Sequence, residues 1–368
     1  MSKPTIIFII NSVQQQRCIK RINEFMDNGY PVKAYGFSRL DVVPTKPERF
    51  TIEVLVHLTN GANYFSRLLI MRDELREVFA TYKGKDVVYY YFMLDVAMAC
   101  RSLSHAPFIY EESDLAHTTL RKPIIAWILE RVDRHVIRRS ILTVFTSEGF
   151  VRYHFGNTSP TKCVVVPNRL NSTILSLPLL PQHTTDMQHL QIGFVGGARY
   201  KSILRFAETI AHRFPQHTFH FFGTLMSELD RLEKLKSYPN IVFHGAFANP
   251  KDLPEIYSKI DLLVSTYDAE IANVRFAEPN KLYESAYFGV PIIVSSGTFL
   301  AEKVRAWGIG YDVDASSEDS IAAFINSLSY DDYCIKKDFA NKIDKYSLIN
   351  HNEALFDKLA AYITHYPN

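Results

Sequence analysis

The chain has 368 residues, of which 47% are hydrophobic and 22% charged, and its formal net charge is +2. This composition is that of a globular protein and excludes a largely disordered one. The small net charge leaves no global field that would draw the chain onto nucleic acid. The length exceeds that of one ordinary core and predicts two domains.

The cysteines and the N-terminus indicate the compartment. Cys18, Cys100, Cys163 and Cys334 are widely scattered, with no CxxC pair and no histidines at metal spacing. This pattern favours a reducing compartment and argues against a structural zinc. The apolar run 6–10 is short and lacks a cleavage site, so a buried strand explains it better than a signal peptide. We expect a soluble cytoplasmic protein, at most peripheral to the inner face of a membrane.

Short apolar runs alternate with longer amphipathic segments through the first half of the chain. The pattern predicts strands at 5–10, 31–35, 49–55, 86–91, 107–110, 142–146 and 163–166, and helices at 18–28, 64–81, 94–103 and 124–140. Strands separated by helices of this length indicate parallel βαβ units.

The stretch 171–188 breaks the rhythm with two prolines among polar residues and is expected to be a linker. The pattern then resumes with strands at 191–195, 218–223, 241–244, 262–266 and 291–295, and helices at 202–213, 225–236, 253–259, 280–288 and 299–307. The predicted fold class is α/β, with two Rossmann-like domains, 1–170 and 189–345, whose parallel sheets face a central cleft. The C-terminal segment 346–368 is expected to form a helix that packs back on the first domain.

The most informative helix is predicted to begin at Pro279, because proline suits a first helical turn. The backbone N–H groups of Asn280, Lys281 and Leu282 would then emerge from a positive helix end, which is an anion site suited to a diphosphate. Lys281 adds a full charge there. Glu284, one turn further on, would accept hydrogen bonds from a ribose diol. The alternative is an amphipathic helix with a surface Glu and Lys.

The string from Glu278 to Pro291, EPNKLYESAYFGVP, resembles the signature of GT-B glycosyltransferases, especially those of family 4. The resemblance implies that Glu284 holds the ribose and that the residues after Pro279 contact the diphosphate. It also implies transfer of a sugar from a UDP- or GDP-linked donor to a saccharide or lipid-linked saccharide acceptor. Retention, no metal, no cofactor and a role in capsular or other surface polysaccharide synthesis belong to the same expectation. The family's second glutamate is replaced by Phe276, so the donor sugar is not implied.

Two further segments resemble parts of the family's donor site. Gly196 and Gly197 end the first strand of the second domain, and Arg199 and Lys201 follow, as in the loop whose basic side chains neutralise the leaving diphosphate. An ordinary Gly-Gly turn near basic residues is the alternative. The turn that contains Phe247 resembles the one whose backbone reads the nucleobase, or is a plain β–α turn.

The first domain offers acceptor-side candidates. Arg17 lies in the loop that opens the first helix, where relatives carry an arginine; a solvated helix residue is the alternative. Glu112 and Asp114 follow a strand end and would bind sugar hydroxyls or cap a helix. The basic, tryptophan-bearing region 121–139 would dock on anionic lipid or pack on the sheet with a basic outer face.

Two rival functions remain open at this level. A sugar-nucleotide epimerase of the same fold would share the nucleotide pocket, and a non-catalytic relative would bind a glycan without turning over a donor. An NAD-dependent enzyme is discounted, because no GxGxxG follows either first strand. In the transferase, replacing Glu284 by alanine is expected to weaken nucleotide binding and to leave the fold intact, because only a helix-surface carboxylate is lost.

Overall fold

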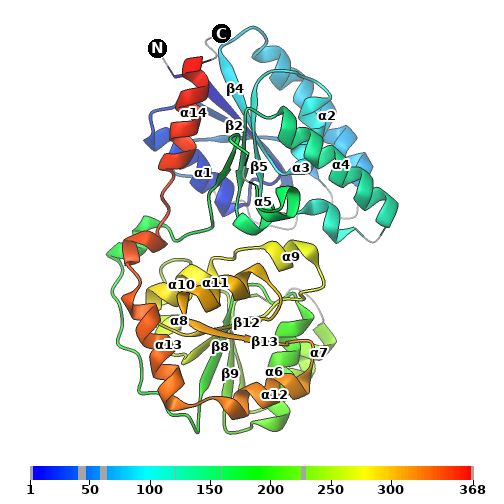
Figure 1. Ribbon diagram of the computed structural model, residues 1–368. Helices are drawn as coiled ribbons and strands as arrows, with labels where there is room; N and C mark the ends of the chain where they lie inside the picture. The colour runs from blue at the N-terminus through cyan, green and yellow to red at the C-terminus, as the bar shows by residue number, and fades with distance from the viewer. Residues whose placement is uncertain are drawn as a thin grey trace. The chain divides into compact units, whose positions relative to one another are not determined.

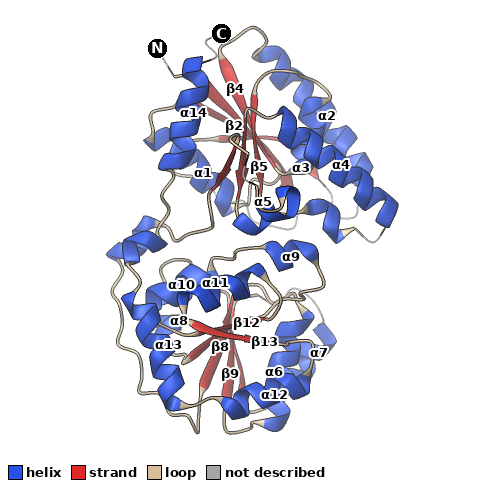
Figure 2. Cartoon of the chain, viewed as in Figure 1, coloured by secondary structure: helices blue, strands red, loops and turns tan. Residues whose placement is uncertain are grey.

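The computed structural model describes residues 3–39, 47–58, 64–120, 122–158, 160–224 and 229–365. They form two compact units: one runs to Val166 and includes the segment from Asn352 onward, and the other spans Pro167 to His351. Each unit is built on one parallel sheet flanked by helices (Figures 1 and 2). The predicted class, two α/β domains with parallel sheets, is confirmed.

The first unit holds a sheet of strand order β3-β2-β1-β4-β5-β6-β7. Its elements are β1 (Thr5–Ile10), α1 (Gln16–Asp27), β2 (Val32–Arg39), β3 (Ile52–Leu58), α2 (Tyr64–Thr81), β4 (Val87–Phe92), α3 (Leu94–Arg101), β5 (Phe108–Glu112), η1 (Ala116–Thr119), α4 (Pro123–Arg139), β6 (Leu142–Phe145), α5 (Glu148–Phe155), β7 (Cys163–Val165) and α14 (Glu353–His365). The central strands β1 and β4 are buried on both faces, which is why they are continuous apolar runs.

The two faces of this sheet are covered by different helices. α1 and α14 lie on one side, and α2, α3 and α4 on the other (Figure 1). Phe25 of α1 stands edge-on to Phe8 of β1 at 5.3 Å between ring centroids, and Phe356 of α14 lies 5.0 Å from Phe25. Leu355 and Leu359 are fully buried in the same cluster. The C-terminal helix is therefore part of the first core.

The second unit holds a sheet of order β10-β9-β8-β11-β12-β13. Its elements are η2 (Ser172–Ser176), β8 (Gln191–Val195), α6 (Lys201–Arg213), β9 (Thr218–Phe222), α7 (Leu229–Leu235), β10 (Ile241–Gly245), α8 (Leu253–Ser258), β11 (Leu262–Ser265), α9 (Ala272–Phe276), α10 (Lys281–Phe288), β12 (Ile292–Ser295), α11 (Phe299–Trp307), β13 (Gly310–Val313), α12 (Glu318–Ser327), α13 (Tyr330–Lys342) and η3 (Lys345–Leu348). α6, α7 and α12 pack on one face, and α8, α10 and α11 on the other. The first part of the expected helix 225–236 lies outside the described residues.

The segment 171–188, expected to be a linker, is fixed to the second unit. Ile174 is buried in its core, and the Ile174 carbonyl accepts a hydrogen bond from the Tyr287 hydroxyl at 3.2 Å. Further along, the Gln182 side-chain amide donates to the Phe288 carbonyl at 2.8 Å. The segment therefore packs on the second unit and stabilises the domain that contains α10.

Candidate functional site

The loops at the carboxyl ends of β8, β9 and β10 are bound tightly together. The Gly196 amide donates to the Phe222 carbonyl, and the Gly223 amide to the Gly245 carbonyl, both at 2.7 Å. A Cβ on Gly223 would lie 2.1 Å from the Gly196 oxygen, and Gly223 has φ +126°. Only glycine fits there, because backbone meets backbone. These contacts lie at the sheet edge at which α/β proteins bind ligands.

The glycine loop and α10 meet at this edge. The Cε of Lys281 lies 3.7 Å from the position that a Cβ on Gly196 would occupy. Two segments that are far apart in the sequence, both singled out for a nucleotide diphosphate, therefore lie side by side in one unit.

Glu284 lies inside the domain, and the expected helix-surface position is wrong. Its side chain is fully buried. Its Oε2 accepts hydrogen bonds from the Tyr257 hydroxyl at 2.5 Å and from Lys281 Nζ at 2.7 Å, while Oε1 accepts one from Asn280 Nδ2 at 2.8 Å. Burial and the Glu284 carboxylate raise the pKa of Tyr257 well above its usual value, so its hydroxyl stays a donor. Because Lys281 Nζ pairs with the Glu284 carboxylate, the positive charge expected from Lys281 at the start of α10 is neutralised.

The start of α10 offers two free backbone amides rather than three. The Leu282 amide donates to the Pro279 carbonyl at 3.2 Å, and Leu282 is fully buried, which corrects its expected role. Within the described part of the chain, the amides of Asn280 and Lys281 make no hydrogen bond. These two donors stand at the positive end of the helix, where an anion is stabilised.

The start of α6 already holds a carboxylate. Asp268, from the loop after β11, accepts hydrogen bonds from the amides of Lys201 at 3.2 Å and Ser202 at 2.9 Å. The side chains of Arg199 and Lys201 are exposed, with the Arg199 guanidinium 5.3 Å from the Tyr200 ring centroid. A phosphate at this helix would compete with Asp268, whereas both basic side chains remain available.

The remaining donor-side candidates have structural neighbours. Phe247, half-buried after β10, packs against the core beneath it, and Gly197 is half-buried in the glycine loop. His220 Nδ1 lies 3.0 Å from His244 Nε2, and the His244 ring stacks on Phe222. Burial lowers the pKa of His220 to about 4, so this pair is neutral at pH 7. It packs the strand ends.

The acceptor-side candidates in the first unit differ in exposure. Arg17 is half-buried in the first turn of α1, and Asp114 is exposed. Glu112 is fully buried, and both its oxygens lie about 3.0 Å from His154 Nε2. Burial and Asp133 raise the pKa of Glu112 well above its usual value. Glu112 is thus enclosed with His154, as Glu284 is with its partners in the second unit, and its contact with a sugar hydroxyl stays a prediction.

Helix α4 combines a packed inner face with an apolar outer one. Leu129 and its neighbours on the inner face are buried against the first unit. Ile124, Trp127 and Ile128 are 75%, 56% and 47% exposed. Arg121, named with this region, lies outside the described residues. Both interpretations of the helix are thus compatible with its two faces.

None of the helices that the structure describes has the length and apolar character needed to cross a bilayer.

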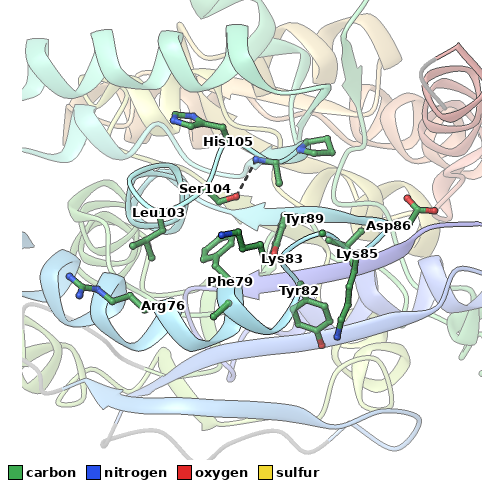
Figure 3. A pocket seen from close by; sticks show the side chains of 15 residues that line it. Arg76, Phe79, Tyr82, Lys83, Lys85, Asp86, Tyr89, Leu103, Ser104 and His105 are labelled. Atoms are coloured by element: carbon green, nitrogen blue, oxygen red, sulfur yellow. Dashed lines mark hydrogen bonds between the residues drawn. The ribbon is translucent and has the colours of Figure 1, made fainter. Parts of the chain in front are cut away.

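A cavity of about 770 Å³ in the first unit lies away from the strand ends considered so far (Figure 3). Tyr82, Lys83, Lys85 and His105 are among the residues that line it. It opens beside the residues that precede β4 and β5, at their amino ends. Because sheets of this kind bind nucleotides at the opposite edge, the cavity is not the donor site.

The chain contains two Rossmann-like domains with parallel sheets. The second domain carries the glycine loop and α10, the helix that follows Pro279 and contains Lys281 and Glu284. Together these features define the GT-B class. Residues 189–331 match the family model described as "Glycosyl transferases group 1". The matched stretch lies within the second unit.

Relatives and solved structures agree with this class. The chain is 23% identical over 265 residues to the succinoglycan biosynthesis protein ExoL of Rhizobium meliloti, a match covering 68% of this chain and 64% of ExoL. The match thus spans less than two thirds of the relative's length.

The solved structures share the fold across almost the whole chain. Sucrose-phosphate synthase from Thermosynechococcus elongatus has a TM-score of 0.71 at 14% identity, covering 98% of this chain and 99% of that one. Anabaena HepE in complex with UDP-glucose gives 0.66 at 15%, covering 97% and 100%. A UDP-GlcNAc 2-epimerase from Neisseria meningitidis gives 0.65 at 14%, also covering 97% and 100%. The predicted resemblance to GT-B glycosyltransferases is confirmed, and the fold alone does not separate transferase from epimerase.

Proposed function

We propose that the protein transfers a sugar from a UDP- or GDP-linked donor to a saccharide or lipid-linked saccharide acceptor, in the synthesis of a surface polysaccharide. The observation that carries the proposal is the buried Glu284 beside the two free amides of Asn280 and Lys281, within a group 1 glycosyltransferase domain. The name of ExoL, a succinoglycan biosynthesis protein, supports the polysaccharide context.

The donor would bind along the start of α10. Its diphosphate accepts hydrogen bonds from the amides of Asn280 and Lys281. Oε2 of Glu284 is already occupied, whereas among the described residues Oε1 accepts from Asn280 alone, and a carboxylate oxygen can accept two hydrogen bonds. Because Glu284 is fully buried, a ribose hydroxyl would become the second donor to Oε1 once the half-buried Asn280 side chain moves aside.

The chemical step is limited by departure of the diphosphate from the anomeric carbon. Arg199 and Lys201, both exposed beside the glycine loop, would stabilise the negative charge that develops on it. We propose that these two cations, with the positive end of α10, do so without a metal or cofactor. Retention at the anomeric carbon is proposed from the family resemblance, with no protein nucleophile.

A thermal-shift panel of UDP, GDP, ADP and CMP tests donor recognition. One of UDP or GDP at 100 times its dissociation constant is expected to stabilise the chain by about 2.7 kcal/mol. No shift with either would contradict the proposal. The sugar-linked form of the same nucleotide should then be consumed only when acceptor extract is added.

Measuring donor consumption with and without acceptor also separates the rival functions. The epimerase alternative is compatible with the fold shared with the UDP-GlcNAc 2-epimerase. An epimerase would convert UDP-GlcNAc to its epimer without any acceptor. A non-catalytic glycan-binding relative would leave every donor unconsumed with any acceptor extract. Donor loss that depends on acceptor, with a glycosylated product, excludes both.

We also propose that the protein works in the cytoplasm at the inner face of the membrane, through α4. The apolar side chains of Ile124, Trp127 and Ile128 would enter the lipid interface, while Arg131, 5.0 Å from the Trp127 ring centroid, meets anionic headgroups.

Vesicle flotation tests the lipid contact. The chain should float with vesicles containing anionic lipid and not with neutral ones. The double variant Trp127→Ser, Ile128→Ser is expected to weaken binding about tenfold, because two half-exposed apolar side chains are removed. Ile335→Ser on α13, also about half exposed, is the matched control and should float like the parent. Equal flotation of both variants would contradict a role for α4.

A further inference from the structure

Four ionisable side chains meet inside the first unit, and none of them belongs to the proposed donor site. Glu112 ends β5, His117 lies in η1, Asp133 in α4 and His154 in α5. Each is at least nine-tenths buried. Ligand atoms of Glu112, Asp133 and His154 all lie within 4.8 Å of one another, and His117 Nδ1 is 3.6 Å from Asp133 Oδ2.

The cluster lacks the partners that a buried charge requires. Within the described part of the chain, no lysine or arginine pairs with Glu112 or Asp133. Asp133 Oδ2 and His117 Nδ1 are buried without a hydrogen-bond partner. Two ionised carboxylates in one dry volume are costly, and either a proton held between Glu112 and Asp133, in line with the raised pKa of Glu112, or a bound cation removes that cost. The unpartnered atoms mark where that cation would sit.

The surrounding hydrogen bonds aim these atoms inward. The Tyr110 hydroxyl donates to Asp133 Oδ1 at 2.8 Å, which leaves Oδ2 facing the cluster. The Tyr153 hydroxyl lies 3.0 Å from His117 Nε2, which leaves Nδ1 facing it. Outer partners of this kind orient the ligands in metal sites and fix the histidine tautomer.

We propose that Glu112, Asp133, His154 and His117 bind one divalent first-row transition-metal ion, with zinc as the expected occupant. Two carboxylates balance the charge of the ion, and two neutral imidazoles complete a four-ligand set of nitrogen and oxygen atoms. In a tetrahedral zinc site with bonds of about 2.1 Å, ligand atoms lie about 3.4 Å apart. The contact of 2.9 Å between His154 and Glu112 is shorter than that spacing. His117 Nδ1 lies 3.6 Å from Asp133 but outside the three-residue group whose ligand atoms are all within 4.8 Å of one another, so the ion would have to draw His117 inward.

The role of this site is structural rather than catalytic. With His117 drawn in beside the three clustered residues, four protein ligands would close the coordination shell, whereas catalytic zinc keeps one position for water or substrate. The ligands come from a strand end, a turn and two helices, so the ion would fasten α4 and α5 to the carboxyl end of β5. The metal-free transfer chemistry proposed for the second domain is independent of it.

Metal content of the full chain, purified without a metal-affinity column, gives the first test. Elemental analysis should find about one equivalent of zinc or another first-row divalent metal, either as purified or after dialysis against Zn²⁺. Chelation should lower the melting temperature by about 5 °C or more, and added Zn²⁺ should restore it. Less than a tenth of an equivalent after dialysis, or a melting temperature indifferent to chelator, overturns the proposal.

Substitutions at the proposed ligands test where the ion binds. Asp133→Asn and His154→Gln should lose the bound metal, and His189→Gln, which alters an exposed histidine paired with Asp186, should keep it. If the ligand variants do not fold, Co²⁺ exchanged into the parent chain should show the visible absorption of a four-coordinate site. Retention of metal in folded Asp133→Asn and His154→Gln, or a six-coordinate cobalt spectrum, overturns the assignment. Nucleotide binding by the second domain stays measurable in either case.

Discussion

Glu284→Gln is expected to weaken binding of the recognised nucleoside diphosphate about 30-fold while the second domain stays folded. The glutamine keeps the shape of the side chain but removes the charge that strengthens a hydrogen bond from ribose to Oε1. Losing a charge-assisted hydrogen bond costs about 2 kcal/mol, which is about 30-fold in the dissociation constant. Isothermal titration calorimetry of both proteins measures the difference.

A matched control separates this effect from a general loss of charge. Glu255 on α8 pairs with Lys259 at 2.6 Å on the surface of the same domain, in an i,i+4 arrangement. Glu255→Gln is therefore expected to bind nucleotide like the parent. A dissociation constant for Glu284→Gln within threefold of that control would remove Glu284 from the donor site.

The burial of Glu284 also changes what an alanine there reports. Alanine leaves Lys281 and the Tyr257 hydroxyl inside the domain without their acceptor. Breaking a buried ion pair by removing one partner costs about 3–5 kcal/mol. Lost binding in Glu284→Ala would thus mix unfolding with recognition. Glutamine also removes the anionic partner of Lys281, but it keeps an oxygen acceptor for Lys281 and Tyr257 and is therefore the more informative substitution.

Much of the fold was predictable because parallel strands are buried on both faces. β1, β4 and β8 are short apolar runs bounded by turns, and β1 and β8 begin and end where the sequence pattern places them. The sequence pattern did not predict elements that lack this contrast between an apolar run and its polar flanks. α5 is a helix of only 8 residues, and β13 at the sheet edge is half polar, with Tyr311 and Asp312 in its centre.

The donor site was only partly visible in the sequence. Pro279 and the residues after it predict a helix start and an anion site through local rules alone. The burial of Glu284 depends on Tyr257 from α8, and the carboxylate at the start of α6 is Asp268 from the loop after β11. The folding of the sheet places these partners next to residues that are distant in the sequence, so no local sequence pattern predicts the contacts.

The buried cluster of the first unit shows the same limit. Its members extend from Glu112 to His154 over a strand end, a turn and two helices, with no ligand spacing of a known metal motif. The sequence pattern argued against a structural zinc, but scattered cysteines bear only on thiolate ligands, and the proposed site would use carboxylates and imidazoles. The choice of Arg17 near the first helix also overlooked Arg21, one turn further on, which the structure places inside the domain.

Arg21→Met is expected to destabilise the first unit by about 3–5 kcal/mol, because it leaves the fully buried Glu111 without its cation. Arg21 Nε lies 2.9 Å from Glu111 Oε2, and its Nη1 lies 2.6 Å from Glu24 and 3.5 Å from Asn352, just before α14. Burial alone would lower the pKa of Arg21, but these carboxylates raise it well above its usual value, so the guanidinium stays charged.

A fall of about 10 °C in the melting temperature of this unit corresponds to that loss, and differential scanning calorimetry measures it. Arg213→Met breaks an exposed pair with Asp319 in the second unit and should change stability by less than about 1 kcal/mol. Adding Glu111→Gln to Arg21→Met should recover part of the loss, since the uncompensated buried charge is removed. If Arg21→Met melts like Arg213→Met, the pair does not hold α1 and the start of the C-terminal helix to the sheet, and another contact must.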